Sequence, residues 1–108
     1  MTDTDLFRLE KQFHQDMIGI YETAKRELHY NASYFIQMVA EHGGLKTAQK
    51  LFWTADVSSG FTVLWEHQRL DLSVEALVLQ EKYDSLFTDG DRKIARDRLE
   101  HYGYKFQS

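Results

Sequence analysis

The chain contains no cysteine, and this absence excludes several kinds of chemistry together. Disulfide bonds, thiolate metal ligands and cysteine nucleophiles are ruled out, and the composition is typical of a protein in a reducing compartment. The chain also lacks an N-terminal apolar run behind a basic segment, and no stretch approaches the roughly 20 apolar residues of a membrane helix. We therefore expect a cytoplasmic protein that neither carries a secretion signal nor enters a membrane.

Proline is also absent, and glycine occurs only six times in 108 residues, so few positions interrupt a helix. From residue 4 to residue 28, apolar side chains recur every three or four positions, which places them on one face of a helix. This stripe consists of Leu6, Leu9, Phe13, Met17, Ile20, Tyr21, Ala24 and Leu28. The first quarter of the chain therefore predicts one long amphipathic helix.

Three shorter helices follow, and each is bounded by a capping residue or a turn. They are expected from a capping Asn31 to Gly43-Gly44, from Leu45 to Phe52, and from Ser58 or Ser59 through Trp65. Because helices this short are marginal on their own, packing against the rest of the domain must stabilise them.

The apolar run over residues 74–79 has two interpretations, since a short run of this kind also suits a buried strand. We favour a fifth helix capped by Ser73, because Glu75 and Ala76 suit a first helical turn and the sequence offers no evident partner strand.

The last helix is expected over residues 89–102. Thr88 and Asp91 have the spacing of a capping box, and Gly103 is placed to adopt the left-handed conformation that ends a helix. Since 108 residues leave little room for a second core, the sequence predicts a single helical domain over residues 1–108. Its fold class is all-α, a compact bundle of five or six helices with a long N-terminal helix.

The run from Arg69 to Leu79 is the most distinctive part of the sequence. Several shorter segments belong to the same pattern. They are Leu64-Trp65-Glu66, Leu86-Phe87-Thr88, Ala95-Arg96 and Tyr102-Gly103-Tyr104, and, earlier in the chain, Tyr30-Asn31-Ala32, Phe35, Gly43-Gly44-Leu45 and Thr47-Ala48. Together these segments resemble a family of small uncharacterised bacterial proteins. The sequence departs from that family at Gln68, where the family carries glycine. The resemblance implies a bacterial or phage origin and a stand-alone domain, and it carries over no functional residue.

Histidine raises the question of a metal site, because Glu10 and His14, and Asp97 and His101, stand four residues apart on predicted helices. Single pairs of this kind are ordinary surface interactions. The dipeptide Glu-His occurs three times near predicted helix C-termini, where a histidine faces the negative end of the helix dipole. The chain also lacks a phosphate-binding loop and a nucleophile elbow. We therefore predict no catalytic residue, no metal site and no cofactor, and a protein that is not an enzyme.

Basic residues are too few for broad binding to phosphate backbones, since the net charge is −4. Only residues 43–70 have a slight positive balance, with three basic and two acidic side chains. A helix-turn-helix interpretation of residues 32–54 rests on weak turn chemistry. The candidate surface for an anionic partner consists of Lys46, Lys50, Arg92, Lys93 and Arg96. Local pairing with acidic neighbours is the competing interpretation of the last three.

Aromatic residues are abundant, with seven Phe, six Tyr and two Trp, more than a small core easily encloses. We expect Phe61 and Trp65 in the core and some of the others in an interface, where large amphipathic rings are favoured. The candidate partner surface consists of Trp53, Arg69, Asp71, Tyr104 and Phe106. Whether Arg69 and Asp71 form a surface or a structural corner is open.

These observations favour a non-catalytic accessory or regulatory protein that binds a protein partner or self-associates. The alternative is a protein associated with nucleic acid, or one that acts in phage defence or anti-defence.

Overall fold

The computed structural model describes residues 3–54 and 56–106, and every regular element in this part of the chain is helical. The α-helices are α1 (Asp3–Leu28), α2 (Ser33–His42), α3 (Gly44–Phe52), α4 (Ser59–Glu66), α5 (Val74–Val78) and α6 (Asp89–His101), and the 3-10 helices are η1 (Leu70–Leu72) and η2 (Glu81–Leu86). The predicted all-α bundle with a long N-terminal helix is confirmed. The strand interpretation of residues 74–79 is wrong, because α5 occupies that run.

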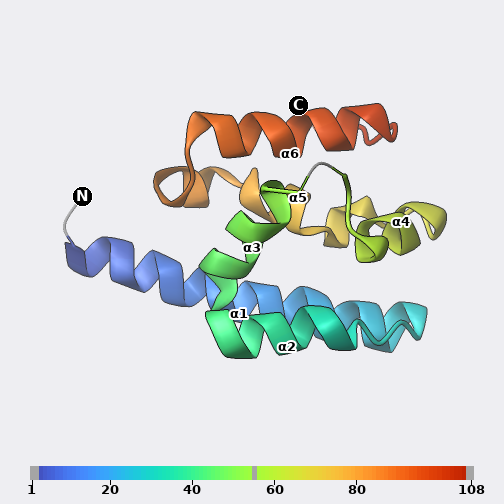
Figure 1. The fold of residues 1–108 in the computed structure, drawn as a ribbon, viewed down its shortest axis with the longest axis horizontal. Coiled ribbons are helices and arrows are strands. Elements are labelled where there is room, and N and C mark those ends of the chain that lie inside the picture. Colours follow the sequence, from blue (N-terminus) through green and yellow to red (C-terminus); the bar gives the residue numbers. More distant parts are fainter. Residues whose placement is uncertain (1–2, 55, 107–108) are drawn as a thin grey trace.

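The helices form two layers joined by α3 (Figure 1). Helices α1 and α2 lie side by side in the lower layer, while α6 runs above them and packs on α5. Helix α3 contacts α1, α2 and α6, so it connects the layers. The hydrophobic side chains between the layers divide into two clusters.

The larger cluster, which we call the closed core, is built around α1. Phe13 and Tyr83 are completely buried there, with ring centroids 5.0 Å apart in an edge-to-face arrangement. The Tyr83 hydroxyl donates a hydrogen bond to Asp16, and burial raises the pKa of Tyr83. The buried members of the closed core are Phe13, Met17, Val39, Ala48, Phe52, Val74, Leu77, Val78, Tyr83, Phe87 and Ala95.

The smaller cluster, which we call the open core, lies where α4, η1 and the end of α6 meet α1. Its buried members are Ala24, Phe61, Leu64, Leu70 and Leu99. Three tyrosines that pack against it, Tyr30, Tyr102 and Tyr104, are only partly buried. The open core is therefore continuous with the molecular surface.

The predicted helix caps are confirmed at three of four helices. The hydroxyl of Ser58 accepts a hydrogen bond from the Phe61 amide, Ser73 caps α5 in the same way, and Thr88 forms a capping box. The prediction for α2 is wrong, because Ala32 stands at the cap position. The side chain of Asn31 accepts a hydrogen bond from the Tyr21 hydroxyl instead, at 2.6 Å.

Three helices end in a left-handed residue, as the Schellman motif requires, and the first is α1, where His29 has φ of 54°. Gly103, with φ of 81°, has this role after α6, as predicted. Gln68, with φ of 59°, has it after α4, and the amides of Gln68 and Arg69 bond to the carbonyls of Trp65 and Leu64. Gln68 therefore occupies a position whose backbone conformation favours glycine.

Candidate functional site

Aromatic side chains gather where the end of α4 meets the end of α6. The ring of Tyr102 is central, with its centroid 5.1 Å from Phe61 and 5.4 Å from Trp65. Further along the chain, the rings of Tyr104 and Phe106 are 5.2 Å apart. We call Trp65, Tyr102, Tyr104 and Phe106 the aromatic face. Every ring pair here has the edge-to-face geometry that aromatic quadrupoles favour.

The turn after α6 holds the second half of this face in place. Because Gly103 is left-handed, the chain folds back and the Tyr104 amide bonds to the Leu99 carbonyl at 2.9 Å. The guanidinium group of Arg96 then lies over the Phe106 ring, 4.6 Å from its centroid, in a cation–π contact. The rings are thus ordered by the backbone and by neighbouring side chains.

The two aromatic residues expected in the core, Phe61 and Trp65, differ in solvent exposure. Phe61 is 2% exposed, which confirms the prediction. Trp65 is 45% exposed, so the prediction is wrong for this residue. The reason is that Leu64 takes the inward position on the last turn of α4, and the Trp65 ring rests against Tyr102 with one side open.

Arg69 and Asp71 form a structural corner. The Nε and Nη2 atoms of Arg69 donate to the two carboxylate oxygens of Asp71 at 3.1 and 3.3 Å, and Nη1 donates to Glu27 of α1 at 2.9 Å. The hydrogen bond from Arg69 lowers the pKa of Glu27, and the bonds with Asp71 and Glu27 raise the pKa of Arg69. These contacts attach the segment after α4 to α1.

The three basic residues predicted on α6 are paired within the chain. Arg92 contacts Asp84 at 2.9 Å, Lys93 contacts Asp97 at 2.8 Å, and Arg96 lies 3.9 Å from Glu100. The hydrogen bond to Asp97 raises the pKa of Lys93. Lys46 and Lys50 of α3 differ, since no acidic group in the described part of the chain lies within 4.0 Å of either ammonium.

Trp53, the remaining predicted partner residue, follows α3 and is 73% exposed. Over residues 3–54 and 56–106, no ring contact joins it to the aromatic face. The structure therefore brings Tyr104 and Phe106 together, and it pairs Trp65 with Tyr102, two residues that were not predicted in the partner surface.

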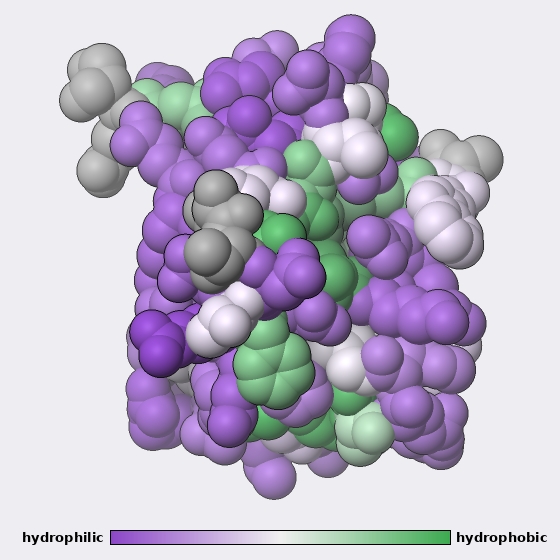
Figure 2. All heavy atoms as spheres, turned by 90° about the vertical axis from the view of Figure 1, so that its left-hand side faces the viewer, coloured by the Kyte–Doolittle hydropathy of each residue, from purple (hydrophilic) through white to green (hydrophobic). Residues whose placement is uncertain are grey.

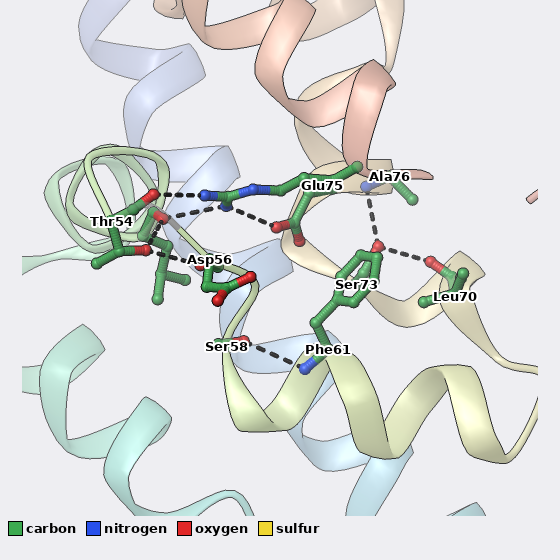
Figure 3. Close-up of polar contacts among 10 residues, drawn as sticks. Thr54, Asp56, Ser58, Phe61, Leu70, Ser73, Glu75 and Ala76 are labelled. Atoms are coloured by element: carbon green, nitrogen blue, oxygen red, sulfur yellow. Dashed lines mark hydrogen bonds and ion pairs between the residues drawn. The ribbon is translucent and has the colours of Figure 1, made fainter. Parts of the chain in front are cut away.

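A buried ion pair that sequence reasoning missed joins three helices (Figure 3). Arg98 of α6 donates to Glu75 of α5 at 3.2 Å, and to the carbonyl oxygens of Leu51 and Thr54 at 3.1 and 2.8 Å. Burial raises the pKa of Glu75, while Arg98 opposes that shift. One feature of the sequence could have indicated this pair. Arg98 stands next to Leu99 on the inward stripe of α6, and a charged residue at such a position needs a buried partner.

A cavity of about 430 Å³ opens between the lower layer and the segment from α4 to α5. Its walls are formed by Ile20, Tyr21, Ala24, Tyr30, Asn31, Ala32, Ser33, Tyr34, Phe35, Met38, Leu51, Ser58, Ser59, Gly60, Phe61, Leu64, Leu72, Ser73, Val74 and Glu75. Glu75 is the one charged side chain among these residues. The cavity therefore joins apolar walls to a buried carboxyl group.

A wider groove of about 600 Å³ lies at the opposite end of α1, between Phe7 and the α2–α3 turn. The end of the molecule that carries the start of α1 shows a strip of apolar atoms framed by hydrophilic ones (Figure 2). His14, a candidate metal ligand, has a structural role here, because its Nδ1 atom accepts a hydrogen bond from the backbone amide of Gly44 in α3 at 2.9 Å.

Residues 3–54 and 56–106 contain no group of three or more His, Asp or Glu side chains arranged to hold a metal ion. In the same residues, no helix has both the length and the apolar character needed to cross a bilayer. Comparisons of the chain with protein-family models, with curated proteins and with solved structures give no match.

Proposed function

We propose that this is a non-catalytic accessory or regulatory protein, of bacterial or phage origin, that acts by binding a protein partner through the aromatic face. The observation that supports this most is the exposure of ordered rings. Trp65 and Phe106 are 45% and 37% exposed, yet each is held by a ring or a guanidinium contact. Rigid aromatic side chains lose little conformational entropy on binding, which is why they dominate binding energy at protein interfaces.

The composition of the aromatic face also suits a protein partner. Tyr102 and Tyr104 each combine a large apolar ring with a hydroxyl group that can donate or accept a hydrogen bond. Trp65 adds an indole N–H donor. A face of this kind can exclude water over its rings and satisfy polar groups at its edge, as the centre and rim of an interface require.

The experiment is a pull-down from bacterial lysate with the N-terminally tagged protein, treated with nuclease and read by mass spectrometry. We expect a protein partner that the wild type retains and that the double variant Trp65→Ala/Phe106→Ala loses. Tyr34→Ala is the matched control, because Tyr34 is 74% exposed on α2 and does not belong to the aromatic face. A partner retained by the double variant, or absent from the wild-type capture, would contradict the proposal.

The alternative, association with nucleic acid, is supported by one observation: Lys46 and Lys50 stand on the same helix without an acidic partner in the described residues. Direct contact predicts a salt-dependent shift of short DNA or RNA that Lys46→Glu/Lys50→Glu abolishes. Lys93→Glu serves as the comparison, since Lys93 already pairs with Asp97. An absent shift at low salt would eliminate direct contact.

A further inference from the structure

The cavity beneath α4 and α5 has the dimensions of a small-molecule site. Pockets that hold small ligands span about 300–1,000 Å³, and this one is about 430 Å³. Such pockets combine mostly apolar walls with a few convergent polar groups. Apolar side chains from both layers line the walls here: Ile20, Ala24, Phe35, Met38, Leu51, Phe61, Leu64, Leu72 and Val74.

The polar side chains of the cavity are hydroxyl groups, the amide of Asn31 and one carboxyl group. The hydroxyl groups of Tyr30 and Ser58 both lie near the first turn of α4, because a methyl group added at Gly60 would be 3.5 Å from the Tyr30 hydroxyl and 3.8 Å from Ser58 Oγ. Ser73 lies at the start of α5 next to Glu75, and both side chains are buried. Four of the lining residues, Ser58, Phe61, Ser73 and Glu75, are drawn in Figure 3.

The charge at the cavity decides which ligands it accepts. Glu75 is 4% exposed, and Arg98 contacts it from α6 without lining the cavity itself. Arg98 holds one oxygen atom of the carboxyl group at 3.2 Å, and no basic side chain is among the residues that line the cavity. A buried carboxylate in a site of low dielectric constant attracts a cation and repels an anion more strongly than it would in water.

We propose that this cavity binds a small aromatic or otherwise apolar molecule that carries a protonated amine. The apolar body fills the space between Phe35, Met38 and Phe61, and the ammonium group donates to Glu75 and to the neighbouring hydroxyls. This site is separate from the aromatic face, so its failure would leave the protein-binding proposal unchanged.

The first test compares three indole ligands of similar shape and different charge: tryptamine, tryptophol and indole-3-acetate. Their affinities are measured by titration followed in ¹H–¹⁵N NMR spectra at neutral pH. We expect tryptamine to bind about tenfold more tightly than tryptophol, a difference that corresponds to about 1.4 kcal/mol. Indole-3-acetate is expected to bind most weakly. Equal affinities, the reverse order, or no binding of tryptamine at millimolar concentration would overturn the proposal.

A matched pair of glycine variants then locates the site. Gly60 and Gly90 are each the second residue of a helix, α4 and α6, and an added Cβ atom meets only ordinary van der Waals contacts at both positions. Gly60→Leu places its side chain in the cavity, whereas Gly90→Leu does not. We expect loss of tryptamine binding in Gly60→Leu and unchanged binding in Gly90→Leu. Retained binding in Gly60→Leu would overturn the assignment of the site.

The role of Glu75 is tested with Glu75→Gln, which keeps the shape of the side chain and removes its charge. We expect this variant to bind tryptamine and tryptophol with equal affinity, at the level of tryptophol in the wild type. A preserved preference for tryptamine would overturn the charge argument. Because Glu75 also pairs with Arg98, folding is checked by circular dichroism, and the glycine pair decides the question if Glu75→Gln unfolds.

Discussion

The closed core and the open core use the same kinds of residue and differ in what surrounds them. In the closed core, Phe13 and Tyr83 contact each other at full burial, and Phe87 completes an edge-to-face trio with Phe13. In the open core, Phe61 is equally buried, but its ring contacts Tyr102, which leads to the half-exposed Trp65. The cavity borders the open core through Ala24, Phe61 and Leu64, and it reaches the closed core at Val74.

This difference assigns stability to the closed core and binding to the region of the open core. The closed core unites α1, α3, α5 and η2 and leaves no ring of its trio accessible to a partner. The open core is built at the other end of α1, where short helices cannot enclose every aromatic residue that the sequence supplies. Exposed apolar groups that the fold holds in a fixed geometry are features of binding surfaces. The aromatic face lies at the open core, and the cavity lies where the open core meets the closed core.

The sharpest comparison is the same substitution in both cores. Phe13→Ala should destabilise the protein by about 4 kcal/mol, because a packed core leaves a full cavity behind. Phe61→Ala should cost about 2 to 3 kcal/mol, because Phe61 is one of the residues that line the cavity and its side chain therefore has fewer neighbouring atoms to lose. The free energies of unfolding are measured by urea denaturation.

Phe7→Ala is the control for the first substitution, because Phe7 lies on the same helix and is 66% exposed. It should change the stability by less than about 0.5 kcal/mol. Equal losses for Phe13→Ala and Phe61→Ala would show that the open core packs as tightly as the closed one.

The second prediction removes the contacts by which Arg98 of α6 holds α5 and the end of α3. Arg98→Met removes a cation from a buried pair and leaves the carbonyl groups of Leu51 and Thr54 without this donor, so it should cost about 3 kcal/mol. Arg96→Met on the same helix is the control, since Arg96 is half exposed and its pair with Glu100 spans 3.9 Å. Its cost should be below about 0.5 kcal/mol.

The cost of Arg98→Met should also depend on pH. Burial raises the pKa of Glu75 above its ordinary value of 4.5, so the contribution of Glu75 to stability is present below that value and is lost as the pH rises through the raised pKa. Without Arg98 the pKa rises further and the loss is larger. The difference in unfolding free energy between wild type and variant should therefore be greater at pH 8 than at pH 5. A difference that is constant with pH would contradict this.

Much of this architecture was predictable because its signals are local. The stripe on α1, the caps at Ser73 and Thr88, and the turn at Gly103 each depend on residues within one or two helical turns. The capping pattern was wrong only at Asn31, where Tyr21, ten residues earlier, competes for the side chain.

The features that were missed depend on contacts between distant segments. Tyr83 bonds to Asp16 across 67 residues, and nothing near Tyr83 in the sequence indicates that its ring is completely buried. The pairing of Arg98 with Glu75 and the cavity both arise from the packing of α5 against α6 and of two layers against each other. Periodicity identifies the inward face of a helix, but it does not identify which residue that face meets.

The third prediction compares the two tryptophans. Trp65→Ala should destabilise the protein by about 1 to 2 kcal/mol, because roughly half of its ring area is buried against Tyr102 and its neighbours. Trp53→Ala should cost less than about 0.5 kcal/mol, since Trp53 is 73% exposed. Unfolding is followed by circular dichroism, because the substitutions change the tryptophan fluorescence. A larger loss for Trp53→Ala would place Trp53, rather than Trp65, in the aromatic structure.

The smallest effect is expected at the turn that positions the open core. Gln68→Gly relieves a left-handed conformation that costs a non-glycine residue about 1 kcal/mol, and it adds about 0.5 kcal/mol of backbone freedom to the unfolded chain. The net result should be a gain in stability of about 0.5 kcal/mol. Gln80→Gly is the control: at φ of −65° there is no strain to relieve, so only the entropic loss remains and the protein should become less stable. If both variants lost stability equally, the left-handed turn after α4 would carry no strain, and the Schellman hydrogen bonds alone would account for the position of Arg69 against α1.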